Sequence, residues 1–216
     1  MDQTTVIEHT AQYVKKSCEG DSSGHDWWHI YRVWQTALHI GREERADLFV
    51  VQLAALLHDI ADWKFHDGDD TVGPPMARSW LEGLGVDEAT IAHVCAIIGD
   101  LSFKGAGVTS LMKSLEGMVV QDADRLDALG AIGIARAFAY GGFKGREMHN
   151  PERKPGRHES FEQYKQGAGP TINHFYEKLL LLKDRMNTQT ARRVAEERHR
   201  FMEEYLERFF KEWKGE

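Results

Sequence analysis

The 216-residue chain has few of the features that mark secreted, membrane or fibrous proteins. It contains only two cysteines, Cys18 and Cys95, and no Cys-x-x-Cys pair, so neither a disulfide framework nor a thiolate zinc site can be built. No apolar run approaches the roughly 18 residues that a membrane span needs, and the first ten residues lack the basic and apolar regions of a signal peptide. These absences predict a cytoplasmic protein with no membrane partner.

Alternating apolar and polar residues, the pattern of β-strands, are nearly absent, whereas apolar residues recur at helical spacing along the chain. The segment 48–60 is apolar on nearly every side, which predicts a central buried helix. Gly85 and Asp87 are expected to end one helix and to begin the next. Further helices are predicted at 29–40, 77–84, 89–98, 118–140, 171–186 and 188–213. The expected fold class is therefore all-α.

One stretch departs from this pattern. Residues 141–170 contain six of the twenty glycines and three of the five prolines, which predicts a long irregular loop. Irregular segments of this length inside a domain are usually functional or disordered, so both a substrate-binding lid and an ordinary surface loop stay open.

Charge and histidine content give the first indication of chemistry. The chain has 27 Lys and Arg against 34 Asp and Glu, a formal charge of −7, which argues against a general nucleic-acid coat and predicts no stable nucleic-acid partner. Eleven histidines are many for this length, and imidazole is the commonest metal ligand in proteins.

The case for a metal site begins with Asp59, which follows Leu-Leu-His at the end of the most apolar helix. A carboxylate buried there without a partner would be costly, and a divalent cation shared with His58 removes that cost. Adjacent residues point about 100° apart on a helix, so a shared metal requires the pair to lie near the helix end. The alternative interpretation is a capping or hydrogen-bonded pair without a metal.

Two further candidate ligands come from other segments. His29 lies on the preceding helix, and Asp124 is expected to open the long helix at 118–140. Two histidines and two carboxylates suit Mn²⁺, Mg²⁺, Fe²⁺, Co²⁺ or Zn²⁺. Alternatively, Asp122, Asp124 and Asp127 are simply carboxylates favoured at a helix N-terminus.

The pattern His29, His58-Asp59 and Asp124 resembles the H…HD…D signature of the HD-domain metal-dependent phosphohydrolases. The flanking runs HDWWHIYRV, AALLHDIADWKF and DADRLDALGAIGIARAF match as well, and GPTINHFYEKLLLLKDRMNT with AEERHRFMEEYLERFF resembles the C-terminal part of the small bacterial YedJ/YpgQ-like hydrolases. The resemblance covers essentially the whole chain. It implies a single HD-domain helical bundle with a core at about 20–140, the loop at 141–170 and a C-terminal helical extension at 171–213.

The resemblance also implies roles for individual residues. His29, His58, Asp59 and Asp124 would bind one divalent metal ion, expected to be Mn²⁺ or Mg²⁺ with Fe²⁺, Co²⁺, Ni²⁺ and Zn²⁺ as alternatives. Asp62 would accept the proton of the attacking water, or else cap a helix or pair with Lys64. Arg125 would contact phosphate, or else form a surface ion pair. On weaker grounds, the candidates for substrate binding are Lys64, Lys104 and His25.

The implied activity is hydrolysis of a small phosphorylated substrate, with a nucleoside triphosphate cleaved to the monophosphate and pyrophosphate as the first choice. A non-catalytic module that binds metal and nucleotide is one alternative, and a di-iron oxygenase is another. The run Asp-Ile-Ala-Asp directly after His58 places no second histidine where the di-iron HD oxygenases need added ligands, which disfavours the di-iron site. The exact substrate and self-association into a homo-oligomer are left open.

Overall fold

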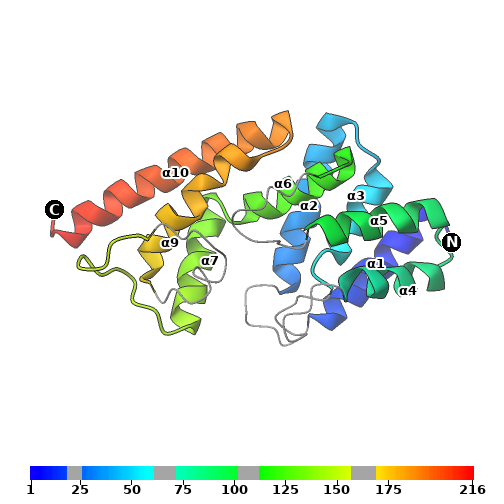
Figure 1. Cartoon of the computed structure of the whole chain (residues 1–216), viewed down its shortest axis with the longest axis horizontal. Helices are drawn as coiled ribbons and strands as arrows, with labels where there is room; N and C mark the ends of the chain where they lie inside the picture. Colours follow the sequence, from blue (N-terminus) through cyan, green and yellow to red (C-terminus); the bar gives the residue numbers. More distant parts are fainter. Residues whose placement is uncertain (19–25, 61–71, 102–111, 157–168) are drawn as a thin grey trace. The chain divides into compact units, whose positions relative to one another are not determined.

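The computed structural model describes residues 1–18, 26–60, 72–101, 112–156 and 169–216. Within these ranges the chain forms helices and no strand, which confirms the predicted all-α class (Figure 1). It divides into two compact units, one holding the described residues up to Ala123 and the other those from Asp124 to Glu216. None of the described helices combines the length and the apolar composition that a bilayer span requires.

The first unit is organised around the helix that the sequence predicts to be buried. Its helices are α1 (Gln3–Ser17), α2 (Trp27–Glu44), α3 (Leu48–Leu57), α4 (Gly73–Gly83), α5 (Glu88–Leu101) and the start of α6 (Leu115–Asp127). Helix α3 packs against α1, α2 and α5, and seven of its ten residues are buried. Each fully buried aliphatic side chain contributes about 1.5–3 kcal/mol, so α3 holds the unit together. Helix α1, capped by Asp2, was not predicted from the sequence.

Side-chain caps set where these helices begin. The Asp47 carboxylate accepts from the backbone N–H of Phe49 at 2.9 Å and so starts α3, while Glu116 on α6 accepts from the N–H of Asp47 itself at 3.0 Å. The predicted boundary between α4 and α5 is confirmed. Gly85 has a φ of 71°, which favours glycine, and Asp87 accepts from the N–H of Thr90 at 3.0 Å.

The described part of the second unit contains the end of α6 and five further elements. These are α7 (Gly130–Phe143), α9 (Thr171–Glu177), the 3₁₀ turns η2 (Leu179–Leu181) and η3 (Lys183–Arg185), and α10 (Gln189–Trp213). Helix α7 packs against α9 and α10. Residues 144–156 are irregular, as predicted, and residues 157–168 lie outside the described part of the chain.

Two helix predictions are wrong. The segment 171–186 is a short helix followed by 3₁₀ turns, whose three-residue period lets Leu179 and Leu182 both be buried. The segment 118–140 is two helices, because Leu129 is extended and Gly130 has a φ of 70°. Asp124 therefore lies in the last turn of α6 and opens no helix, so the alternative of N-terminal carboxylates does not hold.

Arginine side chains hydrogen-bond to polar groups at the C-terminal end of α6, where the chain breaks before α7. Arg198 Nη1 donates to the Leu126 carbonyl at 2.6 Å, and Arg136 Nη1 donates to the Asp127 carboxylate at 2.5 Å. The last carbonyls of a helix have no partner inside it and carry a partial negative charge, so guanidinium groups stabilise this end. A Cβ added at Gly130 would lie 3.0 Å from Cγ of Arg198, so a larger residue at this position would crowd the arginine side chain.

We expect Gly130→Ala to lower the free energy of unfolding by about 1–3 kcal/mol, because the left-handed backbone and the contact with Arg198 both disfavour a methyl group. Denaturant unfolding followed by circular dichroism measures this. Gly142→Ala is the matched control, since it lies on the same helix with nothing within 4 Å of the added Cβ, and it should be neutral or stabilising. Equal midpoints for the two variants would contradict the assignment.

His174 on α9 makes the stability of the fold dependent on pH. Burial, followed by the charges of Lys178 and Arg146, lowers the pKa of His174 from 6.5 to about 3. Between these values the unfolded chain binds a proton that the folded chain does not, so stability is lost as pH falls below 6.5.

From this pKa we expect unfolding free energy to fall by up to about 2 kcal/mol between pH 7 and pH 5, and His174→Gln to flatten that dependence. Unfolding midpoints measured across this range provide the test. His9→Gln, at an exposed position on α1, should keep the wild-type slope. The same slope in both variants would show that His174 does not carry the effect.

Candidate metal centre

Helix α2 presents the first histidine of the candidate site from its first turn. The Asp26 carboxylate caps the helix by accepting from the backbone N–H of His29 at 2.9 Å, which anchors His29 at the third helical position. The His29 side chain is buried, with 1% of its surface exposed. A polar ring at such a position needs polar partners, which other segments must supply.

The second histidine lies where the buried helix α3 ends. The last helical residue is Leu57, and His58 is the C-cap, so His58 and Asp59 lie at a helix end as the sequence requires. Nδ1–H of His58 donates to the Ala55 carbonyl at 2.8 Å. This bond fixes the tautomer in which Nε2 is the basic nitrogen, the arrangement that metal-binding histidines usually have.

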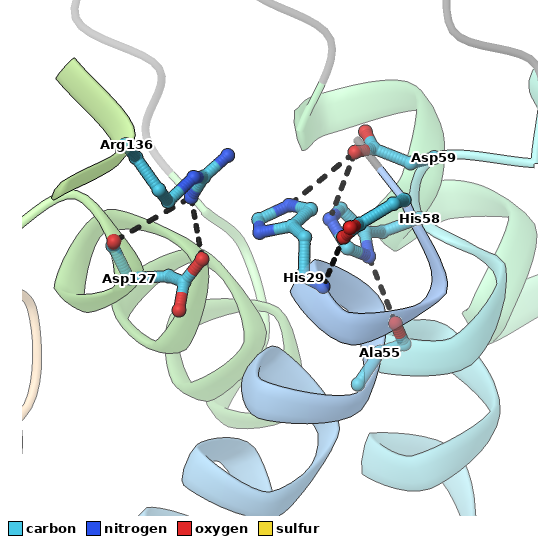
Figure 2. Close-up of polar contacts among 7 residues, drawn as sticks. His29, Ala55, His58, Asp59, Asp127 and Arg136 are labelled. Atoms are coloured by element: carbon cyan, nitrogen blue, oxygen red, sulfur yellow. Dashed lines mark hydrogen bonds and ion pairs between the residues drawn. The ribbon is translucent and has the colours of Figure 1, made fainter. Parts of the chain in front are cut away.

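Three donor groups converge at this point, as Figure 2 shows. Oδ2 of Asp59 lies 3.4 Å from Nε2 of His29 and 3.5 Å from Nε2 of His58, and one donor atom of each residue lies within 4.8 Å of the others. The two imidazole rings approach edge to face, with centroids 5.5 Å apart. All three residues belong to the first unit.

The spacing of these atoms fits one shared cation. Ligands bound at about 2.1 Å in tetrahedral geometry are separated by about 3.4 Å from one another. Direct hydrogen bonds between a carboxylate and imidazole would be shorter, near 2.7–3.0 Å. The observed 3.4 and 3.5 Å therefore favour a metal site over the simple hydrogen-bonded pair. Two nitrogens and a carboxylate oxygen form a donor set that accepts several divalent metals.

The other predicted site residues remain predictions. His25, Asp62, Lys64 and Lys104 lie outside the described residues. Asp124 is half-buried and belongs, with the end of α6, to the second unit.

Arg125 makes a backbone contact within the second unit. Nη1 of Arg125 donates to the carbonyl of Arg185, so a phosphate contact would have to share or replace this bond. Asp127 forms an ion pair with Arg136, within the same unit.

Two supporting groups were missed from the sequence. Asp26 carries a readable signal, since an aspartate directly before the first residues of an apolar helical pattern is a common N-cap. The carbonyl of Ala55 carries none, because every residue has a carbonyl and only the helix end decides which one meets an imidazole.

Comparison with known proteins identifies the family of the chain. The HD domain family matches residues 27–129, a span that includes His29, His58, Asp59 and Asp124. The chain is also 40% identical over 218 residues to the uncharacterised protein YpgQ of Bacillus subtilis, covering 100% of this chain and 97% of YpgQ. The chain therefore belongs to the HD-domain family, within the HD superfamily of hydrolases.

Solved structures extend the relationship over the whole fold. An HD-superfamily hydrolase from Bacillus thuringiensis is 45% identical, with a TM-score of 0.80 and full coverage of both chains. A structure of Bacillus subtilis YpgQ in complex with ADP is 39% identical, with a TM-score of 0.75 and coverage of 95% of this chain and 97% of that one.

If His29 is a ligand, His29→Ala should weaken Mn²⁺ binding by more than the roughly 10- to 100-fold that loss of a supporting partner costs. Calorimetric titration of metal-stripped protein measures this. His39→Ala is the matched control, because His39 is an exposed histidine on the same helix. Equal Mn²⁺ affinity of the two variants would rule out the site.

Proposed function

We propose that the protein is a divalent-metal-dependent phosphohydrolase that acts on a nucleotide, with cleavage of a nucleoside triphosphate to the monophosphate and pyrophosphate as the reaction. The convergence of His29, His58 and Asp59 carries the proposal, because its spacing suits a metal better than direct hydrogen bonds. Support for a nucleotide comes from the similarity to YpgQ, which was crystallised with ADP.

The chain's own residues prepare this site for a cation. Asp26 and the carbonyl of Ala55 hold the two histidines, so little conformational entropy is lost when their Nε2 atoms bind. Asp59 supplies the negative charge. When bound, a divalent ion supplies Lewis-acid chemistry: it makes water a better nucleophile and withdraws charge from a phosphoryl oxygen. We propose Mn²⁺ or Mg²⁺ as the ion. We propose Asp124 as the fourth ligand because it occupies the last position of the H…HD…D motif.

A cation is also needed because the surrounding charge opposes an anionic substrate. Residues 1–123 contain 9 Lys and Arg against 19 Asp and Glu, a formal charge of −10. Like charges repel a polyphosphate at long range, so binding depends on local cations. We propose Arg125, Lys64 and Lys104 as phosphate contacts and His25 as a further substrate contact.

Proton transfer is the remaining chemical task. We propose Asp62 as its acceptor, because it follows Asp59 by three residues and a carboxylate near the attacking water can take its proton. General-base catalysis of this kind is worth about 10²- to 10⁴-fold in rate.

The test is a screen for released phosphate, run with and without added inorganic pyrophosphatase so that pyrophosphate is also detected, over nucleoside triphosphates, deoxynucleoside triphosphates, monophosphates and p-nitrophenyl phosphate. Metal-stripped protein is supplied with Mn²⁺, Mg²⁺, Co²⁺ or Ni²⁺. We expect metal-dependent turnover of a triphosphate, lost in Asp59→Ala together with metal binding. Asp62→Asn should keep the metal and lose about 10²- to 10⁴-fold in kcat.

Two results would contradict the proposal. Full activity of Asp59→Ala would show that the metal cluster is not the catalytic site. An unchanged kcat in Asp62→Asn would remove the base role of that residue alone. Metal analysis of the active protein adds a further check, since two irons per chain would indicate oxygenase chemistry instead.

A further inference from the structure

Helix α2 carries aromatic side chains on the turns that also hold His29. Trp27 contacts Tyr31 with ring centroids 6.1 Å apart, and Trp28 contacts the same tyrosine edge to face at 6.0 Å. Tyr31 in turn contacts Trp34 edge to face at 6.2 Å. Two of these rings face solvent, because Trp28 is 59% exposed and Tyr31 39% exposed. We call Trp28 and Tyr31 the aromatic pair.

This exposure is unusual among the described tryptophans of the first unit. Trp80 stacks on Tyr13 with centroids 3.9 Å apart and donates to the Thr10 hydroxyl at 3.0 Å, so packing explains it fully. Trp34 donates from Nε1 to Gln52 at 3.2 Å. Trp28 has no such burial, and leaving an indole in water forfeits the stabilisation that burial of a large apolar side chain provides.

The position of Trp28 relative to the metal cluster suggests what covers it. Trp28 directly precedes His29, so their Cα atoms are about 3.8 Å apart, and the two side chains leave the helix about 100° apart. Side chains in the first turn also lean toward the helix N-terminus. The indole and the first histidine of the cluster therefore leave the same N-terminal turn of α2, the indole on its exposed side and the histidine on its buried side.

We propose that Trp28, held edge-on by Tyr31, stacks on the base of a nucleotide whose phosphates bind at the His29–His58–Asp59 cluster. This inference rests on the proposed function and names the residue that recognises its substrate class. Every nucleobase has an aromatic face, so stacking selects nucleotides over other phosphate esters without selecting one base. The contact of Trp28 with Tyr31 limits the motion of the indole and lowers the entropic cost of stacking.

The first experiment measures ADP binding to the full chain loaded with Mn²⁺, by calorimetry and by tryptophan fluorescence. Loss of one stacked base costs about 5- to 150-fold in affinity, which is the weakening expected for Trp28→Ala. Trp28→Phe should keep most of the affinity but lose the fluorescence quenching caused by the stacked base. Trp213→Ala, at a tryptophan 49% exposed on α10, is the matched control and should bind ADP like the wild type.

A second measurement separates this inference from the proposed function. For Trp28→Ala we expect KM to rise for nucleoside triphosphates and to stay unchanged for inorganic tripolyphosphate. If ADP binding depends on Trp28 but neither a nucleoside triphosphate nor a phosphate ester is cleaved, the stacking role stands and the hydrolase proposal fails. If triphosphates are cleaved with the same KM in Trp28→Ala, the hydrolase stands and the stacking role is wrong.

Two other results would also overturn the stacking role. One is the absence of measurable ADP binding to the metal-loaded wild type. The other is a change of oligomeric state in Trp28→Ala at unchanged ADP affinity, which would assign the aromatic pair to contact with a second copy of the chain.

Discussion

The first unit depends on one constraint: its most apolar helix ends directly in a histidine and an aspartate. Helix α3 is buried on nearly every side by α1, α2 and α5, so its last residues have no route to solvent except at the helix end. His58 and Asp59 occupy that end, and His29 meets them from α2. Because this brings two imidazole nitrogens and a carboxylate oxygen within 4.8 Å of one another, the packing that stabilises the unit also assembles a donor set for a cation.

Ordinary features of helix ends do the positioning around this site. A cap at Asp26 orients the first turn of α2, and the C-terminal turn of α3 supplies the Ala55 carbonyl that sets the tautomer of His58. The exposed Trp28 is a neighbour of His29 in the same turn. The proposed metal ligand and the proposed base-stacking residue are thus placed by a single cap, which links local helix chemistry to both metal binding and substrate recognition.

The errors in the prediction have clear physical origins. Periodicity could not separate α6 from α7, because Leu126, Leu129 and Ile134 continue an apolar pattern across the break. Gly130 was the available signal, but glycine inside a helical pattern is often tolerated. The turns after α9 were missed for a similar reason, since four consecutive leucines suit a buried helix as well as two 3₁₀ turns. Helix α1 was overlooked because only Val6, Thr10 and Val14 are buried in it.

The sequence by itself determined the all-α class, the central buried helix and the order of the candidate ligands, because spacing and flanking residues are local properties that can be read along the chain. Only the tertiary structure decided that the donor atoms of His29, His58 and Asp59 lie close enough together to share one cation, since that depends on how α2 packs on α3. It also decided which tryptophans are packed and which face solvent. Trp80 and Trp28 look alike in sequence, and only the presence of Tyr13 and Thr10 beside one of them makes the difference.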